Sequence, residues 1–199
     1  MDGMITLIEG SRCFDTGYRD WHRQRRFLAD EIDAGGTILD LGCANGFLLR
    51  CLQKWSGQPL IPYGIDIDPL VIATCHRLFP HCPDHFRCLD LRHFGGHTAA
   101  GFPACYDYVF WNMPNRWPCS AKRQQLERLA PLVAPGGKLL IAAYGGNAPE
   151  LTAWQRQEEK RALASTFSQL SALGIRFQRI RFNPHGTQHA VGVIQHPVV

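Results

Sequence analysis

The sequence predicts an α/β protein built on a doubly wound, mostly parallel β-sheet, and three observations lead to this fold class. Short apolar runs alternate with helical segments along most of the chain, a pattern that produces right-handed crossovers and a parallel sheet. A glycine-containing loop follows the first of these runs directly. The last two runs, 176–182 and 189–195, are separated by a turn-forming cluster too short for a crossover helix, so they predict an antiparallel hairpin at one edge.

The first predicted strand and its loop lie in the segment TILDLGCANGF, from Thr37 to Phe47. Its apolar residues are typical of a strand that is buried on both faces. Asp40 interrupts this run, and burying a carboxylate is costly unless it is hydrogen-bonded, so we expect Asp40 to accept from loop amides or from a ligand. Gly42 and Gly46 permit positive φ angles and the close approach of a ligand. The segment therefore predicts a strand, a glycine loop and a helix that begins at Phe47.

The remaining elements are expected in alternating order around this segment. An amphipathic helix precedes it over 18–32. Asp68 and Pro69 are residue types favoured at the N-cap and first turn of a helix, and Gly174 is a typical helix stop. Further strands are expected at 60–65, 85–89, 106–111 and 138–144, and further helices from Pro69, at 120–132 and at 149–173.

Length and composition predict one cytoplasmic domain over 1–199, with a helical cap at 1–36 and the sheet-containing core at 37–199. No apolar run approaches the roughly 18 residues of a membrane span, and no basic segment precedes a signal-like run, so we expect no membrane contact. The formal net charge of +4 does not by itself indicate nucleic acid. The oligomeric state is left open.

Eight cysteines are present, but disulfide scaffolds belong to short secreted chains, so most of the thiols are interpreted as small core residues. A group of cysteines and histidines leaves a structural zinc site as the alternative: Cys75, His76, His81, Cys82, His85 and Cys88. No pair in this group has CxxC spacing, and Pro83 interrupts the HxxxH spacing of His81 and His85. We therefore expect no metal.

Two clusters of arginine admit two interpretations. One is a solvated helix face near the N-terminus and the outer face of a strand near the C-terminus; the other is a site for a polyanionic substrate. The clusters consist of Arg19, Arg23, Arg25 and Arg26, and of Arg176, Arg179 and Arg181, which alternate with apolar residues.

Three acids, Asp40, Asp66 and Asp90, end three consecutive predicted strands. In an open α/β sheet, this edge is where ligands bind. A carboxylate suits the two adjacent hydroxyls of a ribose, and Ile67 beside Asp66 offers an apolar wall for a base. Taken alone, Asp66 could instead be the helix N-cap in place of Asp68, and Asp90 could open a turn.

These segments resemble the class I S-adenosylmethionine-dependent methyltransferases, from about Thr37 to the C-terminal hairpin. ILDLGCANGF looks like the first motif of that family, GIDIDPLVIA like the second, and RCLDLRHF like the segment after strand three. LVAPGGKLLIAAY is similar to its loop and fifth strand. The resemblance implies a Rossmann-like, seven-stranded sheet in the order 3-2-1-4-5-7-6. It also implies S-adenosyl-L-methionine as cofactor and S-adenosyl-L-homocysteine as product.

The resemblance further implies roles for individual residues. Asp66 would bind the ribose hydroxyls, with Ile67 beside the adenine ring, and Asp90 would hydrogen-bond the adenine amino group, with Leu91 next to it. The amino acid end of the cofactor would be held by the strand-terminal acid and the glycine loop, which are Asp40, Gly42, Cys43, Ala44, Asn45 and Gly46.

A nicotinamide-dependent dehydrogenase is the competing interpretation of a glycine loop after a strand. That class requires GxGxxG, in which the middle glycine lets the backbone approach a pyrophosphate. Gly42, Ala44 and Phe47 occupy the three positions here, so two of the three glycines are missing. The sequence of the loop therefore favours S-adenosylmethionine over a nicotinamide dinucleotide as the ligand.

Asn112, after the fourth predicted strand, is the candidate catalytic residue and a further cofactor contact. It falls where amino-methylating members of the family carry the Asn of an NPPY motif, although the tetrapeptide here is Asn112, Met113, Pro114 and Asn115. Its side-chain carbonyl would orient an amine or a hydroxyl. The alternative is that Asn112 caps a turn.

Several aromatic residues are candidates either for the site or for the core. Tyr108 is expected in the core, Trp111 in either place, and Trp117 in an exposed position near the site. Trp21 and Tyr18 on the N-terminal helix are candidates for a lid over the methionine end of the cofactor.

The sequence therefore predicts a methyltransferase in which alignment of acceptor and methyl group supplies much of the acceleration. A small-molecule acceptor is expected. Two alternatives stay open: a nucleic-acid methyltransferase, prompted by the arginines and the NPPY remnant, and a noncatalytic protein that binds the cofactor.

Overall fold

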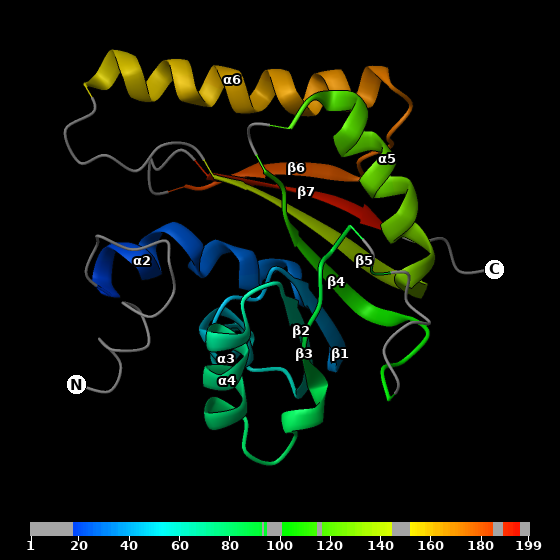
Figure 1. Ribbon diagram of the computed structural model, residues 1–199. Helices are drawn as coiled ribbons and strands as arrows, with labels where there is room; N and C mark the ends of the chain where they lie inside the picture. The colour runs from blue at the N-terminus through cyan, green and yellow to red at the C-terminus, as the bar shows by residue number, and fades with distance from the viewer. Residues whose placement is uncertain are drawn as a thin grey trace.

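In the computed structural model, the described residues form one seven-stranded sheet in the order β3-β2-β1-β4-β5-β7-β6 (Figure 1). These residues are 18–92, 94, 101–114, 117–144, 152–184 and 189–195. Neighbouring strands among β1 to β5 pair in parallel, and β7 is antiparallel to both β5 and β6. The predicted fold class and strand order are confirmed. The strands are β1 (Gly36–Leu41), β2 (Leu60–Asp66), β3 (Phe86–Cys88), β4 (Tyr106–Asn112), β5 (Val133–Tyr144), β6 (Arg179–Phe182) and β7 (His189–Gln195).

Helices cover both faces of the sheet (Figure 1). α3 and α4 pack on one face together with η1, and α5 and α6 pack on the other. The α-helices are α2 (Tyr18–Arg25), α3 (Phe47–Ser56), α4 (Pro69–Leu78), α5 (Cys119–Leu129) and α6 (Ala153–Ala172). The short 3-10 helices are η1 (Arg26–Glu31), η2 (Pro83–His85) and η3 (Ala130–Leu132).

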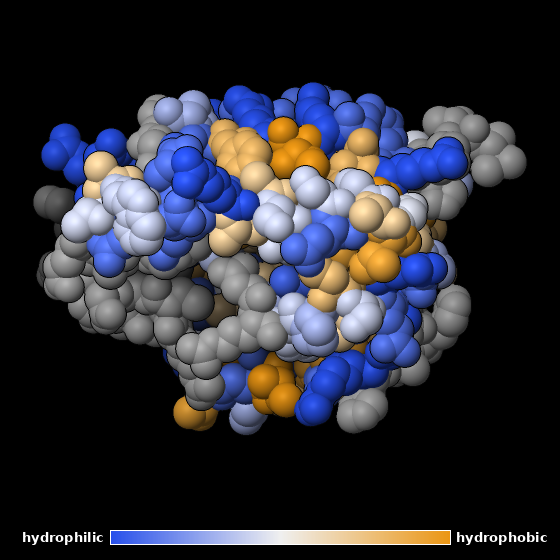
Figure 2. Space-filling view, turned by 90° about the horizontal axis from the view of Figure 1, so that it is seen from above, coloured by the Kyte–Doolittle hydropathy of each residue, from blue (hydrophilic) through white to orange (hydrophobic). Residues whose placement is uncertain are grey.

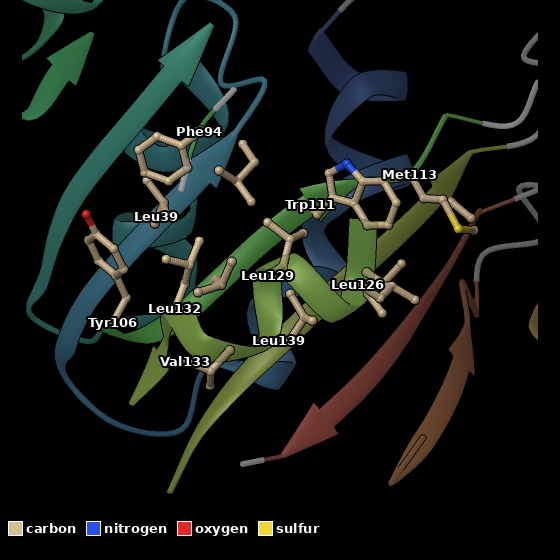
Figure 3. Packing of buried hydrophobic residues seen from close by; sticks show 14 of the residues in the cluster. Leu39, Phe94, Tyr106, Trp111, Met113, Leu126, Leu129, Leu132, Val133 and Leu139 are labelled. Atoms are coloured by element: carbon tan, nitrogen blue, oxygen red, sulfur yellow. The ribbon is translucent and has the colours of Figure 1, made fainter. Parts of the chain in front are cut away.

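The hydrophobic core has two main layers, one on each face of the sheet. Figure 3 shows Leu126 and Leu129 of α5, with Leu132 after it, beside the strands that carry Trp111 and Leu139. Leu163, Phe167 and Leu170 of α6 belong to the same layer. Seen from above α6, the surface is mixed but mostly hydrophilic, with separate hydrophobic areas (Figure 2). α6 therefore buries one narrow apolar stripe and exposes most of its length.

The element ends differ from the prediction where local chemistry intervenes. The expected helix over 18–32 divides into α2 and the 3-10 helix η1. β5 begins at Val133 instead of 138, because the pairing with β4 shifts register between Tyr106 and Tyr108 and accommodates Gly136 at a φ of 77°. The described part of the helix predicted from 149 begins after Thr152, whose side chain forms a capping box with Gln155. Residues 1–17 of the predicted cap and 149–151 lie outside the described part of the chain.

Histidines of the suspected zinc group are placed against backbone carbonyls. A His76 ring nitrogen lies 3.2 Å from the carbonyl oxygen of Phe86, and Nδ1 of His85 lies 3.1 Å from that of Pro62. Among the residues that the structure describes, no three His, Cys, Asp or Glu side chains gather into a possible metal site. Within the same residues, no helix is long and apolar enough to cross a membrane.

Candidate cofactor-binding site

A pocket lies where the carboxyl ends of β1, β4 and β5 meet α2 and the start of α3. Six of the residues predicted from the sequence line it: Asp40, Gly42, Cys43, Ala44, Asn45 and Asn112. Gly46 follows them directly at the N-cap of α3. Asp66, Ile67, Asp90 and Leu91 lie beyond this pocket, at or just after the ends of the neighbouring strands β2 and β3.

The glycine loop is hydrogen-bonded to the end of β2. The amides of Gly42 and Cys43 both donate to the carbonyl oxygen of Ile65, at 2.9 Å each. Ala44 has a φ of 48°, in the left-handed region, and its amide donates to Oδ2 of Asp66 at 2.9 Å. The amides of Gly42, Cys43 and Ala44 thus donate to β2 and not to Asp40. Of the two partners expected for Asp40, loop amides or a ligand, a ligand is the one that these hydrogen bonds leave open.

Residues of the same loop flank the N-terminus of α3 and bind one of its first amides. Oδ1 of the buried Asn45 accepts from the amide of Phe47 at 3.2 Å. Gly46 has a φ of 76°, and a Cβ there would meet the ring of Phe79 at 3.0 Å. Glycine is thus favoured at position 46 both by the backbone angle and by the close approach of Phe79 at the end of α4.

Asp66 connects the loops that follow β1 and β2. Oδ2 of Asp66 accepts from Ala44, and Oδ1 accepts from the amide of Asp68 at 3.0 Å. Each carboxylate oxygen can accept more than one hydrogen bond, so both retain capacity for a ligand hydroxyl. The N-cap of α4 is Asp68, whose Oδ1 accepts from Leu70 at 2.9 Å. The alternative of Asp66 as that cap is thus excluded.

An apolar surface and a paired carboxylate lie beyond Asp66. Ile67 is 62% exposed and Leu70 is 76% exposed, so both present apolar surface to the solvent. Oδ1 of Asp90 accepts a hydrogen bond from the backbone amide of Arg92 at 2.8 Å, and Oδ2 accepts one from Nη2 of the same arginine at 2.6 Å. An adenine amino group would have to share this carboxylate with Arg92.

Asp40 is the most strongly perturbed acid of the pocket. Its side chain is almost completely buried. Loss of water, and secondarily the nearby charge of Asp66, raise the pKa of Asp40 to about 8. Asp40 is therefore mostly protonated at neutral pH, and a cation placed beside it would favour its ionised form.

The pocket is also lined by Trp21, a candidate for the predicted lid, and by Arg25 and Tyr144, which the sequence did not assign to this site. The guanidinium carbon of Arg25 lies 5.1 Å from the ring centre of Trp21 and 4.8 Å from that of Tyr144. Arg25 is only 4% exposed, so its interpretation as part of a solvated helix face is wrong. The available signal was its spacing of four residues from Trp21, which puts both on one face of α2.

The acceptor side of the pocket is formed by the end of β4. Asn112 is exposed and lines the pocket, whereas Trp111 is completely buried on the other side of the strand. Trp117 is half-buried and packs against Trp111, with ring centres 6.3 Å apart, so its predicted exposure near the site is wrong. Tyr108 lies in the core as expected, where its hydroxyl donates to Oδ1 of Asp33 at 3.0 Å. Asn115 lies outside the described residues.

Comparison with known proteins agrees with this architecture. No family model matches the chain. A ribosomal protein L11 methyltransferase from Burkholderia cenocepacia is 23% identical over 178 residues, which cover 83% of this chain and 55% of that protein. The chain thus spans about half the length of the curated relatives it matches.

Solved structures share the fold at low sequence identity. The structure of a putative S-adenosylmethionine-dependent methyltransferase from Methanococcus maripaludis aligns with this chain with a TM-score of 0.63 and 15% sequence identity. The alignment covers 98% of this chain and 93% of that chain. The N-methyltransferase NodS from Bradyrhizobium japonicum, in complex with S-adenosylhomocysteine, has a TM-score of 0.61 and 13% identity, covering 97% and 98%. Since the strand order agrees with these comparisons, the chain has the fold of the S-adenosylmethionine-dependent methyltransferases and is similar to them in sequence.

Proposed function

We propose that the protein is an S-adenosylmethionine-dependent methyltransferase, and that the amino acid end of the cofactor lies between Asp40 and Arg25. The observation that carries this proposal is that one acid and one arginine, both almost completely buried, line the same pocket. An α-amino acid has an ammonium and a carboxylate, so it would give each of these side chains an opposite charge. Buried charges are stabilised by such pairing.

The rest of the proposed cofactor site follows the carboxyl edge of the sheet. Asp66 would accept from the ribose hydroxyls with the oxygen lone pairs that the amides of Ala44 and Asp68 leave available. Ile67 would cover one face of the adenine, with Asp90 and Leu91 at its edge. When bound, S-adenosylmethionine supplies a methyl group activated by a sulfonium centre.

The chain's own contribution to methyl transfer is positioning and the exclusion of water. Trp21, Phe47 and Phe110 give the pocket apolar walls. Asn112, exposed at the end of β4, would orient the acceptor through its side-chain amide. An in-line displacement gains most from such alignment of its reacting atoms.

We propose a small molecule as the methyl acceptor. The arginines that suggested a polyanion are largely engaged: Arg26 and Arg181 pair with Asp30, Arg179 pairs with Glu31, and Arg25 is buried. This weakens the nucleic-acid alternative. A protein acceptor is the second candidate, because the curated relative is named for a ribosomal protein.

Calorimetric titration with S-adenosylhomocysteine tests the cofactor assignment, and no heat of binding at millimolar ligand would contradict it. Incubation with methyl-labelled cofactor and a cell lysate then tests the reaction. Label in the fraction that passes a small-pore filter supports a small-molecule acceptor. Label retained with protein or with nuclease-sensitive material supports the other acceptors, and no transferred label supports a noncatalytic binder.

Replacement of Arg25 should weaken binding of the amino acid tail selectively. Arg25→Gln removes a charge-assisted hydrogen bond, so the Kd of S-adenosylhomocysteine should rise about 10- to 100-fold. The Kd of 5′-deoxy-5′-methylthioadenosine, which lacks the tail, should stay the same. Arg19→Gln, on the exposed part of the same helix, is the matched control. Equal losses for both ligands would remove Arg25 from this role.

Replacement of Asp66 should weaken both ligands, because both contain the ribose. Asp66→Ala also frees the amide of Ala44, so the expected rise in Kd is at least about tenfold for either ligand. Circular dichroism and thermal unfolding serve as checks that the sheet is intact. An unchanged affinity in a folded variant would exclude Asp66 from the ribose site.

A further inference from the structure

The edge strand β6 and the residue directly after it contact the N-terminal cap segment, defined here as α2 and η1 (18–31), through three alternating side chains. These are Arg179, Arg181 and Asn183, and we refer to them as the β6 latch. They recur at every second position, so they share one face of the extended chain. The cap segment is more than 140 residues away in sequence.

The two arginines of the latch reach the acids of η1. Nε of Arg179 donates to Oε2 of Glu31 at 2.7 Å, and Nη2 of Arg179 bonds to the same oxygen. Nη2 of Arg181 lies 2.8 Å from Oδ2 of Asp30, and Nη1 lies 3.6 Å from Oε1 of Glu31. Glu31 is completely buried, so these arginines take the place of water around its side chain.

The third latch residue binds the end of α2. Nδ2 of Asn183 donates to the carbonyl oxygens of Arg23 at 2.9 Å and of Gln24 at 3.1 Å. These carbonyls belong to the last turn of the helix, where intrahelical partners are lacking. Asn183 is itself buried, and its own amide donates to the carbonyl of His189 at 2.8 Å, which anchors it to β7.

The latch acts at a distance from the pocket. Among the described residues that line the pocket, none belongs to β6. The cap segment, by contrast, contributes Trp21 and Arg25 to that lining, and Arg25 directly follows the two residues whose carbonyls Asn183 holds. The position of Arg25 is therefore set from one side by the latch and from the other by the rings of Trp21 and Tyr144.

We propose that Arg179, Arg181 and Asn183 are positioning residues for the cofactor, which hold the cap segment so that Trp21 and Arg25 close the pocket over the amino acid tail. This inference rests on the proposed function for the identity of the ligand. A released cap lets the bound ligand leave faster. Association is affected less, because the glycine loop and Asp66 remain in place.

The test measures dissociation of S-adenosylhomocysteine by stopped-flow displacement for wild type, Arg179→Gln and Asn183→Ala. Loss of the charge-assisted contact of Arg179, or of the two hydrogen bonds of Asn183, should raise the dissociation rate constant about tenfold, with little change in the association rate constant. Arg179→Lys, which keeps the charge, should recover part of this loss. Arg176→Gln is the matched control, since it removes an exposed arginine three residues away that lies outside the latch.

Hydrogen exchange of the unliganded protein provides a second readout that does not depend on the ligand. Peptides covering 18–31 should exchange faster in Arg179→Gln and Asn183→Ala, whereas peptides covering β1 and β2 should not change. Wild-type dissociation rates together with unchanged exchange of 18–31 would overturn the latch. Faster exchange in the variants of a protein that binds no S-adenosylhomocysteine would support the latch on the cap but refute the proposed function.

Discussion

The affinity for S-adenosylhomocysteine should rise about tenfold for each pH unit from about pH 6 to about pH 8, and Asp40→Asn should lose this dependence. Burial raises the pKa of Asp40 to about 8, so the unliganded pocket holds a neutral carboxyl at lower pH. An ammonium beside Asp40 favours the carboxylate, and binding must then release a proton. Release of one proton makes the observed association constant increase with pH until Asp40 is already ionised in the free protein.

Calorimetry at several pH values, in buffers with different ionisation enthalpies, measures both the affinity and the proton released. Asp40→Asn is the close mimic of the protonated side chain, so it should fold normally and bind weakly with little dependence on pH. Any titration of the ligand amine is common to both proteins and cancels in the comparison. Equal slopes for wild type and Asp40→Asn would show that Asp40 does not meet the ammonium.

Much of the lining of the candidate pocket could be predicted from the sequence because its signals are local. The strand, the acid and the glycine loop of 37–47 occupy consecutive positions, and the parallel topology brings the ends of β1, β2 and β3 to one edge. Asn112 was found in the same way, from its place after β4. A short window of sequence contains each of these signals completely.

The places of Arg25 and Tyr144 in the pocket lining depend on contacts between distant segments, and the spacing of Arg25 from Trp21 was their one local signal. Arg25 lines the pocket from a helix whose last carbonyls accept from Asn183, and a helix rich in arginine looks solvated when taken alone. Trp117 shows the reverse case. Its polar and proline-rich neighbours suggest exposure, yet Trp111 gives it an apolar partner.

Fold class was predictable for a similar reason, and element ends were not. Strands buried on both faces give continuous apolar runs, and these runs can be recognised in the sequence whatever the register in which the strands pair. The start of β5 depends instead on a shift in its register with β4, and the switch from α2 to η1 depends on packing against the sheet. Such features are set by neighbours across the fold.

Lowering the pH from about 6.5 to about 4.5 should destabilise the wild-type protein by about 3 kcal/mol relative to His189→Leu. The His189 ring is completely buried, and neither of its nitrogens has a hydrogen-bond partner among the residues that the structure describes. It packs on Tyr144, with ring centres 4.9 Å apart, and the charge of Arg25 lies near it. Burial first, and Arg25 second, lower the pKa of His189 to about 3.

The sign of this effect follows from where the proton binds. Below its ordinary pKa, His189 is protonated in the unfolded chain but stays neutral in the folded protein until about pH 3. Stability therefore falls by about 1.4 kcal/mol for each pH unit in this window. Urea unfolding at several pH values measures it, and His81→Leu, on an exposed histidine, is the control. A constant difference between wild type and His189→Leu across the window would contradict the prediction.

Asp40 should make the free energy of unfolding depend on pH with a slope of the opposite sign. Its folded-state pKa is raised, so the folded protein binds the extra proton between about pH 4 and pH 8, and stability falls as pH rises through that range. From about pH 4 to about pH 6.5, the two contributions largely cancel in the wild-type protein. Unfolding of Asp40→Asn and His189→Leu should therefore reveal two slopes of opposite sign that the wild-type profile conceals.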